Sequence, residues 1–282
     1  MKKEIGIIGL GNVGSMLLSK IIEFNIYEEN HIYVANRSKE KIDRALEQYP
    51  KLNVCENNKE LAKKCKDIII CVEPLNLPAV MAEIKPYLST ETYLMISTTM
   101  VASKDLLKIH NGNITIFMPT LISLVNSGVT LVYHSDNVTD RDKNIFENIL
   151  DKISEVVDLD EEDINITQNL TASFPGIFAE IMLEFVKSTL KYSSNVTHEK
   201  LEKMLLISIN GASKLLIDKN MSFEETIDRV STKGGITYEG VKVCKEKLPI
   251  VFDETIEATV NRYNAIVAEA GSMIDNLIEE DR

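Results

Sequence analysis

Short apolar runs alternate with amphipathic stretches through the first half of the chain. The apolar runs cover Ile5–Ile8, His31–Ala35, Asp67–Val72, Thr92–Ser97, Ile114–Phe117 and Val129–Tyr133. Four of them are nearly continuous Val, Ile and Leu, which is typical of strands buried on both faces of a sheet. Helical periodicity lies between them, at Val13–Phe24, Lys39–Tyr49 and Leu61–Cys65. This alternation predicts a doubly wound parallel sheet.

The period becomes helical in the second half, and no strong strand signal follows residue 135. Thr139 with Asp142 forms a capping box, which predicts a helix to residue 153 near the end of the first domain. An acidic run over residues 158–163 indicates a solvated connector. We therefore expect an α/β protein with two domains. Residues 1–160 would form an N-terminal Rossmann-type domain, and residues 161–282 an all-helical C-terminal domain for substrate binding and dimerisation.

Apolar stripes at helical spacing are generous in this second half, although no predicted sheet is present for them to cover. They end in a stripe from Phe252 to Leu277 that predicts a long terminal helix. A second capping box, Ser222 with Glu225, predicts a helix to about Val230. The stripes are either a helical core or the interface of a homodimer or higher homo-oligomer, and their extent favours the interface.

A Gly-x-Gly-x-x-Gly loop joins the first predicted strand to the first predicted helix. Its glycines are Gly9, Gly11 and Gly14, and Asn12 and Val13 stand before the last one. Between a strand and a helix, this spacing is typical of dinucleotide binding. The first glycine permits a tight turn, the second lets the backbone approach a pyrophosphate, and the third lets helix and strand pack closely. The helix N-terminus then offers unpaired N–H groups to the phosphates.

The end of the second predicted strand selects the cofactor. An NAD site usually places a carboxylate there, on the ribose 2′-hydroxyl. Here Asn36, Arg37 and Ser38 follow the strand and no carboxylate is present. The Arg37 guanidinium is a ready partner for a 2′-phosphate, so the expected cofactor is NADPH (NADP+).

Composition argues against three other kinds of protein: nucleic-acid binders, membrane proteins and metalloproteins. A net charge of −12 and an absence of Trp argue against nucleic-acid binding. No uncharged apolar run is long enough to span a membrane, which favours a cytoplasmic protein. The four cysteines contain no Cys-x-x-Cys pair and the four histidines are scattered, so no metal site is expected.

A glycine pair in the helical half is a candidate substrate site. The loop reads Ser231-Thr232-Lys233-Gly234-Gly235-Ile236-Thr237. Consecutive glycine N–H groups ahead of a helix form an anion nest. Thr237 either caps the following helix or offers its hydroxyl to a ligand. A second loop, over residues 170–176, is either a hinge at a pocket wall or the start of a helix.

The order of these motifs resembles the pyrroline-5-carboxylate reductase family from end to end. Between them stand Cys71-Val72-Glu73-Pro74, Met118-Pro119 and Ser173-Phe174-Pro175. The resemblance adds Val72, Glu73 and Pro74 to the cofactor site and implies hydride transfer from NADPH to the imine carbon of 1-pyrroline-5-carboxylate, giving L-proline. It also implies that the imino acid binds at Thr232, Gly234, Gly235 and Ile236, with Thr237 as the catalytic hydroxyl at the imine nitrogen.

Four positions depart from the family pattern. Glu73 replaces a lysine, Thr120 begins a replacement of Asn-Thr-Pro, Phe174 replaces a glycine and Lys233 replaces a proline. The Lys-Gly-Gly-Ile-Thr loop is also similar to the competence-associated offshoot of this family in Gram-positive bacteria. Two functions therefore stay open. One is a reductase of pyrroline-5-carboxylate or a related imino acid, and the other is an NADP-binding regulatory paralogue with weak or no turnover.

Overall fold

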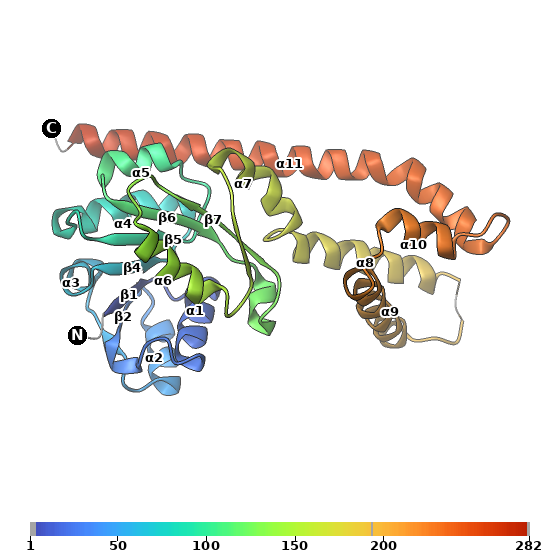
Figure 1. Ribbon diagram of the computed structural model, residues 1–282, viewed down its shortest axis with the longest axis horizontal. Coiled ribbons are helices and arrows are strands. Elements are labelled where there is room, and N and C mark those ends of the chain that lie inside the picture. The colour runs from blue at the N-terminus through green and yellow to red at the C-terminus, as the bar shows by residue number, and fades with distance from the viewer. Residues whose placement is uncertain (1–3, 193, 281–282) are drawn as a thin grey trace. The chain divides into compact units, whose positions relative to one another are not determined.

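The computed structural model describes residues 4–192 and 194–280 (Figure 1). The chain forms two compact units, of which the first combines Met1–Ser173 with Thr259–Arg282 and the second is Phe174–Ala258. Among the described residues, no helix has the length and apolar character needed to cross a bilayer.

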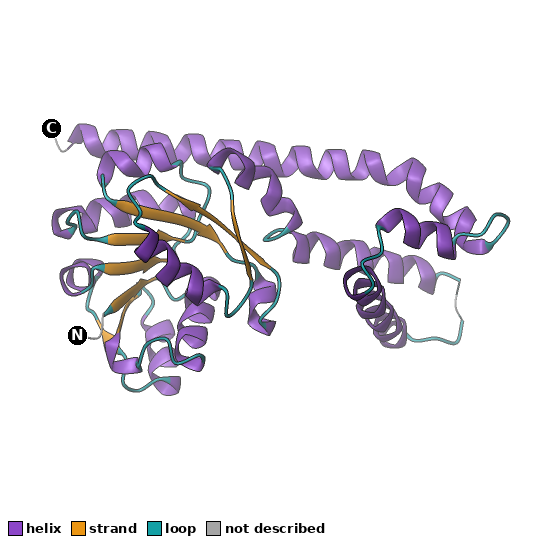
Figure 2. Ribbon diagram, viewed as in Figure 1, coloured by secondary structure: helices purple, strands orange, loops and turns teal. Residues whose placement is uncertain are grey.

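The first unit is built on one eight-stranded sheet in the order β3-β2-β1-β4-β5-β6-β7-β8. Figure 2 shows strands of this sheet in orange, with purple helices around them. The strands are β1 (Ile5–Ile8), β2 (Ile32–Ala35), β3 (Asn53–Val54), β4 (Asp67–Ile70), β5 (Tyr93–Ile96), β6 (Asn113–Met118), β7 (Val129–His134) and β8 (Glu155–Asp158). Neighbouring strands are parallel except for β6 and β7, which are antiparallel. The run from β3 to β6 has the strand order of a doubly wound dinucleotide-binding sheet, so the expected Rossmann-type fold is confirmed.

Three details of the sheet differ from the expectation. β7 runs antiparallel to β6 because the two strands are joined by a short connection, which contains a 3₁₀ helix over Leu121–Val125 rather than a crossover helix. β8 contradicts the expected lack of strands after residue 135, and β3 was also not expected. Both strands are short and lie at the sheet edges, where neither is buried. Their sequences therefore lack the continuous apolar run that marks the inner strands.

Helices cover both faces of the sheet, and the inner strands contribute side chains to two hydrophobic cores, one on each face. Ile69 of β4 packs in one core, while Ile68 and Ile70 pack in the other, because successive side chains of a strand point to opposite faces. The first core includes α1 (Asn12–Glu23), α2 (Lys39–Gln48) and α6 (Asp140–Leu150). The second includes α3 (Asn58–Lys64), α4 (Leu77–Ile84) and α5 (Ser103–Ile109).

The end of the chain belongs to the first unit. α11 (Ile236–Glu280) buries Ala270 and Ile274 completely in the second core. The Tyr263 hydroxyl donates to the Thr99 carbonyl at 2.7 Å, and the pKa of this phenol is raised by burial. The compact units therefore do not follow the expected division between residues 160 and 161. The first unit continues through β8 and α7 (Glu161–Thr167) to residue 173 and resumes at residue 259.

The second unit is entirely helical in its described part. It contains α8 (Phe174–Leu190), α9 (His198–Asp218), α10 (Phe223–Val230) and the beginning of α11. The Ser222 capping box is formed, since the Glu225 N–H donates to Ser222 Oγ and the Ser222 N–H donates to Glu225 Oε2. Val186 is the only fully buried apolar side chain among its described residues. Large apolar side chains such as Phe185 and Phe223 are 61% and 72% exposed.

Candidate functional site

A pocket of about 580 Å³ opens where β1, β2 and β4 end. Ile8, Ala35 and Cys71 stand at these carboxyl ends and line it. In a doubly wound sheet, ligands bind outside the carboxyl ends of the strands, where the strand order reverses. Here the order reverses between β1 and β4, so the pocket occupies the position of a dinucleotide site.

The three glycines of the loop after β1 have different roles. Gly9 has a φ of +94°, and a Cβ there would lie 2.3 Å from the Cys71 carbonyl oxygen. A Cβ on Gly14 would lie 1.9 Å from the Gly9 carbonyl oxygen. A Cβ on Gly11 would meet no atom within 4 Å. Gly9 and Gly14 are therefore required by the fold, whereas Gly11 keeps space open at the pocket.

The N-terminus of α1 is left available for an anion. The helix follows Gly11, which offers no side-chain cap, and its first turn contains no acidic residue. Its first N–H groups therefore have no side-chain acceptor and carry the positive end of the helix dipole. These are the properties expected of a pyrophosphate site.

Two cations line the pocket at the beginning of α2. Arg37 and Lys41 both line it, and neither forms an ion pair within the described part of the chain. Arg44, one turn further along α2, is by contrast paired with Glu40. Ser38 stands at the N-cap of α2, yet its hydroxyl makes no capping hydrogen bond. This end of the pocket thus offers two uncompensated positive charges and a hydroxyl.

Carboxylates and amides also line the pocket. Glu56, Glu73 and Glu83 all line the pocket. Glu83 Oε2 accepts a hydrogen bond from Asn58 Nδ2 at 2.8 Å, which fixes that carboxylate. The Asn57 side chain accepts from the Glu60 N–H and so caps α3. The pocket lining therefore carries carboxylates as well as the two cations.

The structure brings together seven of the predicted cofactor residues as pocket lining: Gly9, Gly11, Asn36, Arg37, Ser38, Val72 and Glu73. The other four do not line the pocket: Asn12, Val13 and Gly14 form the first turn of α1, and Pro74 begins a short 3₁₀ helix.

Lys41 and the pocket residues of α3 and α4 were not among the residues predicted from sequence. Lys41 had a detectable signal, because it is the third residue of α2 and helical side chains point back toward the N-terminus. Asn58 and Glu83 had none, since they come from separate elements that only the fold brings to one wall.

The predicted substrate loop lies in the second unit, between α10 and α11. Gly234 has a φ of +85°, and the Gly235 N–H donates to the Thr232 carbonyl at 2.9 Å. α11 begins at Ile236, so Thr237 is inside the first helical turn instead of at the N-cap. Its exposed hydroxyl makes no hydrogen bond within the described chain. The roles of Thr232, Gly234, Gly235, Ile236 and Thr237 stay predictions.

Two other departures from the family pattern are well defined. Phe174 begins α8, and its ring stacks on Phe178 with centroids 5.3 Å apart. Thr120 is buried and accepts a hydrogen bond from the Ile122 N–H. Leu121 is 62% exposed and follows Thr120 in the connection between β6 and β7.

Cys71, which lines the pocket, is not an activated nucleophile. Cys71 is buried, and burial raises the pKa of its thiol to about 12, although a hydrogen bond with Ser97 acts in the opposite direction. The thiol is therefore protonated at neutral pH and acts as a small apolar group.

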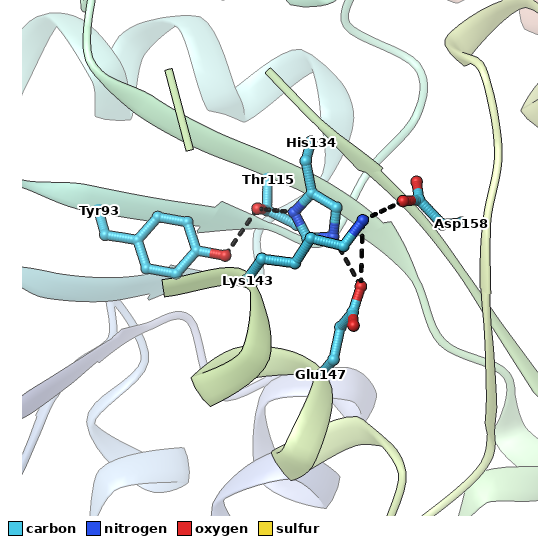
Figure 3. Close-up of polar contacts among 6 residues, drawn as sticks. All are labelled: Tyr93, Thr115, His134, Lys143, Glu147 and Asp158. Carbon is cyan, nitrogen blue, oxygen red and sulfur yellow. Dashed lines mark hydrogen bonds and ion pairs between the residues drawn. The ribbon is translucent and has the colours of Figure 1, made fainter. Parts of the chain in front are cut away.

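A second polar cluster lies between β7, β8 and α6 (Figure 3). His134 Nε2 is 3.1 Å from Glu147 Oε1, and His134 Nδ1 is 2.7 Å from Thr115 Oγ1. The donor atoms of His134, Glu147 and Asp158 lie within 4.8 Å of one another, as metal ligands would. However, the Lys143 ammonium bonds to Asp158 and lies 3.7 Å from Glu147 Oε1. A side chain therefore already supplies the positive charge between these carboxylates.

Two family descriptions match different parts of the chain. Residues 4–100 match the family described as NADP oxidoreductase coenzyme F420-dependent. Residues 161–266 match the family described as pyrroline-5-carboxylate reductase dimerisation.

Similar proteins span almost the whole chain. Pyrroline-5-carboxylate reductase 3 of Bacillus subtilis (strain 168) is 32% identical over 270 residues, which cover 95% of this chain and 98% of that protein. ComE operon protein 4 of the same organism is 24% identical over 260 residues, 92% of this chain and 95% of that protein.

Solved structures of pyrroline-5-carboxylate reductases have the same fold. The Coxiella burnetii enzyme superposes with a TM-score of 0.81 at 25% identity, over 94% of this chain and 99% of that one. The Plasmodium falciparum pyrroline carboxylate reductase, solved with NADP bound, superposes with a TM-score of 0.80 at 22% identity. The match covers 96% of this chain and 98% of that one. With a relative 32% identical along nearly its full length, this chain belongs to the pyrroline-5-carboxylate reductase family.

Proposed function

We propose that this protein reduces 1-pyrroline-5-carboxylate to L-proline with NADPH, a reaction of proline biosynthesis. The observation that carries the proposal is the pocket at the ends of β1, β2 and β4. It combines open space at Gly11 with uncompensated charge at Arg37 and Lys41. This arrangement fits NADPH, whose pyrophosphate and 2′-phosphate need anion donors at two separate places.

In this proposal the first unit binds and orients the cofactor. The N–H groups at the beginning of α1 hold the pyrophosphate, and Arg37 with Lys41 holds the 2′-phosphate. When bound, the cofactor supplies a hydride to the imine carbon. The protein needs no strongly basic group for this step, because an iminium is already electrophilic.

The substrate loop of the second unit holds the imino acid. N–H groups of Gly234, Gly235 and Ile236 donate to the substrate carboxylate, and the hydroxyl of Thr232 assists them. The imine nitrogen takes a proton from the solvent to form the iminium. As the carbon of this iminium gains hydride, the π electron pair moves to the nitrogen and leaves a secondary amine. The Thr237 hydroxyl hydrogen-bonds to this nitrogen and stabilises the change more than it aids substrate binding.

A regulatory NADP-binding protein is the second candidate. Glu73 places a carboxylate at the pocket, Phe174 occupies a position where the family has a glycine, and ComE operon protein 4 is among the similar proteins. The deciding experiment measures NADPH oxidation with pyrroline-5-carboxylate and NADPH binding by calorimetry on one preparation. Turnover supports the reductase, and tight binding without turnover on this or related imino acids contradicts it.

We also infer that the protein is a homodimer or a higher homo-oligomer. The second unit buries one apolar side chain fully, Val186, among its described residues, and it lies within the segment that matches a dimerisation family. Burying such a surface against a second copy stabilises it by roughly 25 cal/mol per Å². Light scattering should give at least twice 31.7 kDa, and a monomer at micromolar concentration would contradict this. A cytoplasmic location stays a prediction from the sequence.

A further inference from the structure

One amide side chain connects the two phosphate-binding loops of the pocket. Asn36 follows β2 directly and is half-buried. Its Oδ1 accepts a hydrogen bond from the Leu10 N–H at 2.8 Å, and its Nδ2 donates to the Ser38 carbonyl at 2.9 Å. Leu10 belongs to the glycine loop, whereas Ser38 stands beside Arg37 at the beginning of α2. A single side chain thus joins segments 26 residues apart in the sequence.

Only an amide of this length has the required chemistry. The Leu10 N–H needs an acceptor and the Ser38 carbonyl needs a donor, and asparagine offers both in one planar group. Aspartate accepts but does not donate when ionised, and serine is too short to reach both partners. Because Asn36 is engaged with the backbone of both loops, its side chain organises the pocket instead of acting first as a phosphate ligand.

We propose that Asn36 is a positioning residue that fixes the spacing between the pyrophosphate subsite at Gly11 and the 2′-phosphate subsite at Arg37. NADPH spans both subsites, so it gains from having them pre-organised. A ligand that occupies one subsite gains much less. This inference rests on NADPH as the cofactor of the proposed function, but not on reduction of pyrroline-5-carboxylate.

The test compares three ligands on Asn36→Ala by calorimetry. NADPH occupies both subsites, NADH lacks the 2′-phosphate, and adenosine 2′-monophosphate lacks the pyrophosphate. Without these two hydrogen bonds, the cost of ordering the two loops falls on NADPH binding, which should weaken by up to roughly 30-fold, the full contribution of two hydrogen bonds. NADH and adenosine 2′-monophosphate should each weaken by about threefold or less, so the preference for NADPH over NADH falls.

A matched control is available at the other end of β2. The Asn53 Nδ2 donates to the carbonyls of Asn30 and Ile32 at 2.8 and 3.3 Å, and Asn53 does not line the pocket. Asn53→Ala should change the melting temperature while leaving the affinity for NADPH at the wild-type value. If Asn36→Ala does not fold, Asn36→Ser serves in its place, because it is neutral, polar and too short to join the loops.

The outcome separates positioning from a general loss of structure. A selective loss of NADPH binding in the folded variant supports the proposal. Wild-type affinity for NADPH, or an equal loss for all three ligands, overturns it. Because every readout is a dissociation constant, absence of turnover on pyrroline-5-carboxylate would contradict the proposed function without touching this result.

Discussion

The second glycine of the loop after β1 allows a sharp test of the pocket. An added Cβ at Gly11 meets no protein atom within 4 Å, whereas one at Gly14 falls 1.9 Å from the Gly9 carbonyl oxygen. Gly11→Ala should therefore leave the fold intact and obstruct the cofactor. Gly14→Ala should instead damage the fold.

The expected magnitudes follow from the backbone. Gly11 has a φ of −76°, which alanine adopts without strain, so the lower entropy of the unfolded chain contributes about 0.4–1 kcal/mol of stability. Gly11 is also the N-cap of α1, where alanine costs roughly 0.5–1 kcal/mol relative to glycine. The two effects oppose each other, and the unliganded free energy of unfolding should change by less than about 0.5 kcal/mol. Gly14→Ala forces backbone apart and should cost about 1–3 kcal/mol or more.

Gly11→Ala, which should hardly change stability, should have a large effect on NADPH binding. The methyl group of Gly11→Ala occupies the space through which N–H groups reach the pyrophosphate. Loss of one charge-assisted hydrogen bond weakens binding by roughly 1.5–3 kcal/mol, or about 10- to 150-fold.

Thermal unfolding with and without NADPH measures both quantities. In the wild type, NADPH at about 100 times its dissociation constant stabilises the protein by about 2.7 kcal/mol. A roughly 10- to 150-fold weaker affinity in Gly11→Ala should remove about half to nine-tenths of this stabilisation at the same NADPH concentration. Calorimetric titration gives the dissociation constant directly. Wild-type affinity in Gly11→Ala would refute the assignment of the pyrophosphate to this loop, and wild-type stability in Gly14→Ala would refute the packing argument.

Three further outcomes are expected. Arg37→Ala should lower the ratio of the NADH and NADPH dissociation constants by about 10- to 150-fold, since a charge-assisted phosphate contact contributes roughly 1.5–3 kcal/mol. Equal dissociation constants for the two cofactors in the wild type would contradict this. Thr237→Val should lower kcat by roughly 10- to 1,000-fold with unchanged NADPH affinity and melting temperature, and lost stability with kcat intact would make Thr237 a structural residue. Burial lowers the pKa of His134 in the folded protein, although the hydrogen bond with Glu147 acts in the opposite direction. As the pH falls below the ordinary value of 6.5, His134 is therefore protonated in the unfolded chain before it is protonated in the folded protein. Stability should then fall by at most about 1.4 kcal/mol per pH unit for this proton, and chemical denaturation of His134→Gln between pH 5 and 8 should show a shallower slope; an unchanged slope would contradict the shift.

Local pattern determined the elements that are marked by continuous apolar runs or fixed residue spacing. β1, β2, β4 and β5 are predicted because strands buried on both faces are almost entirely apolar in sequence, with Asp67 at the start of β4 as the charged exception among these four. The glycine loop is predicted because its turn, its approach to phosphate and its helix packing depend on residues within one short segment.

Contacts between distant segments decided the rest. β8 is a strand because it pairs with β7 at the sheet edge, while its own Glu155 and Asp158 hide the apolar signal. The final part of α11 joins the first unit because Ala270 and Ile274 find their core among helices far earlier in the chain. Asn36 gains its two partners from separate loops, and His134 meets Glu147 only when β7 and α6 pack together. Sequence periodicity indicates which face of an element is apolar. It does not indicate which other element that face packs against, because this depends on long loops that bring distant segments together, and no local sequence signal marks such loop closure.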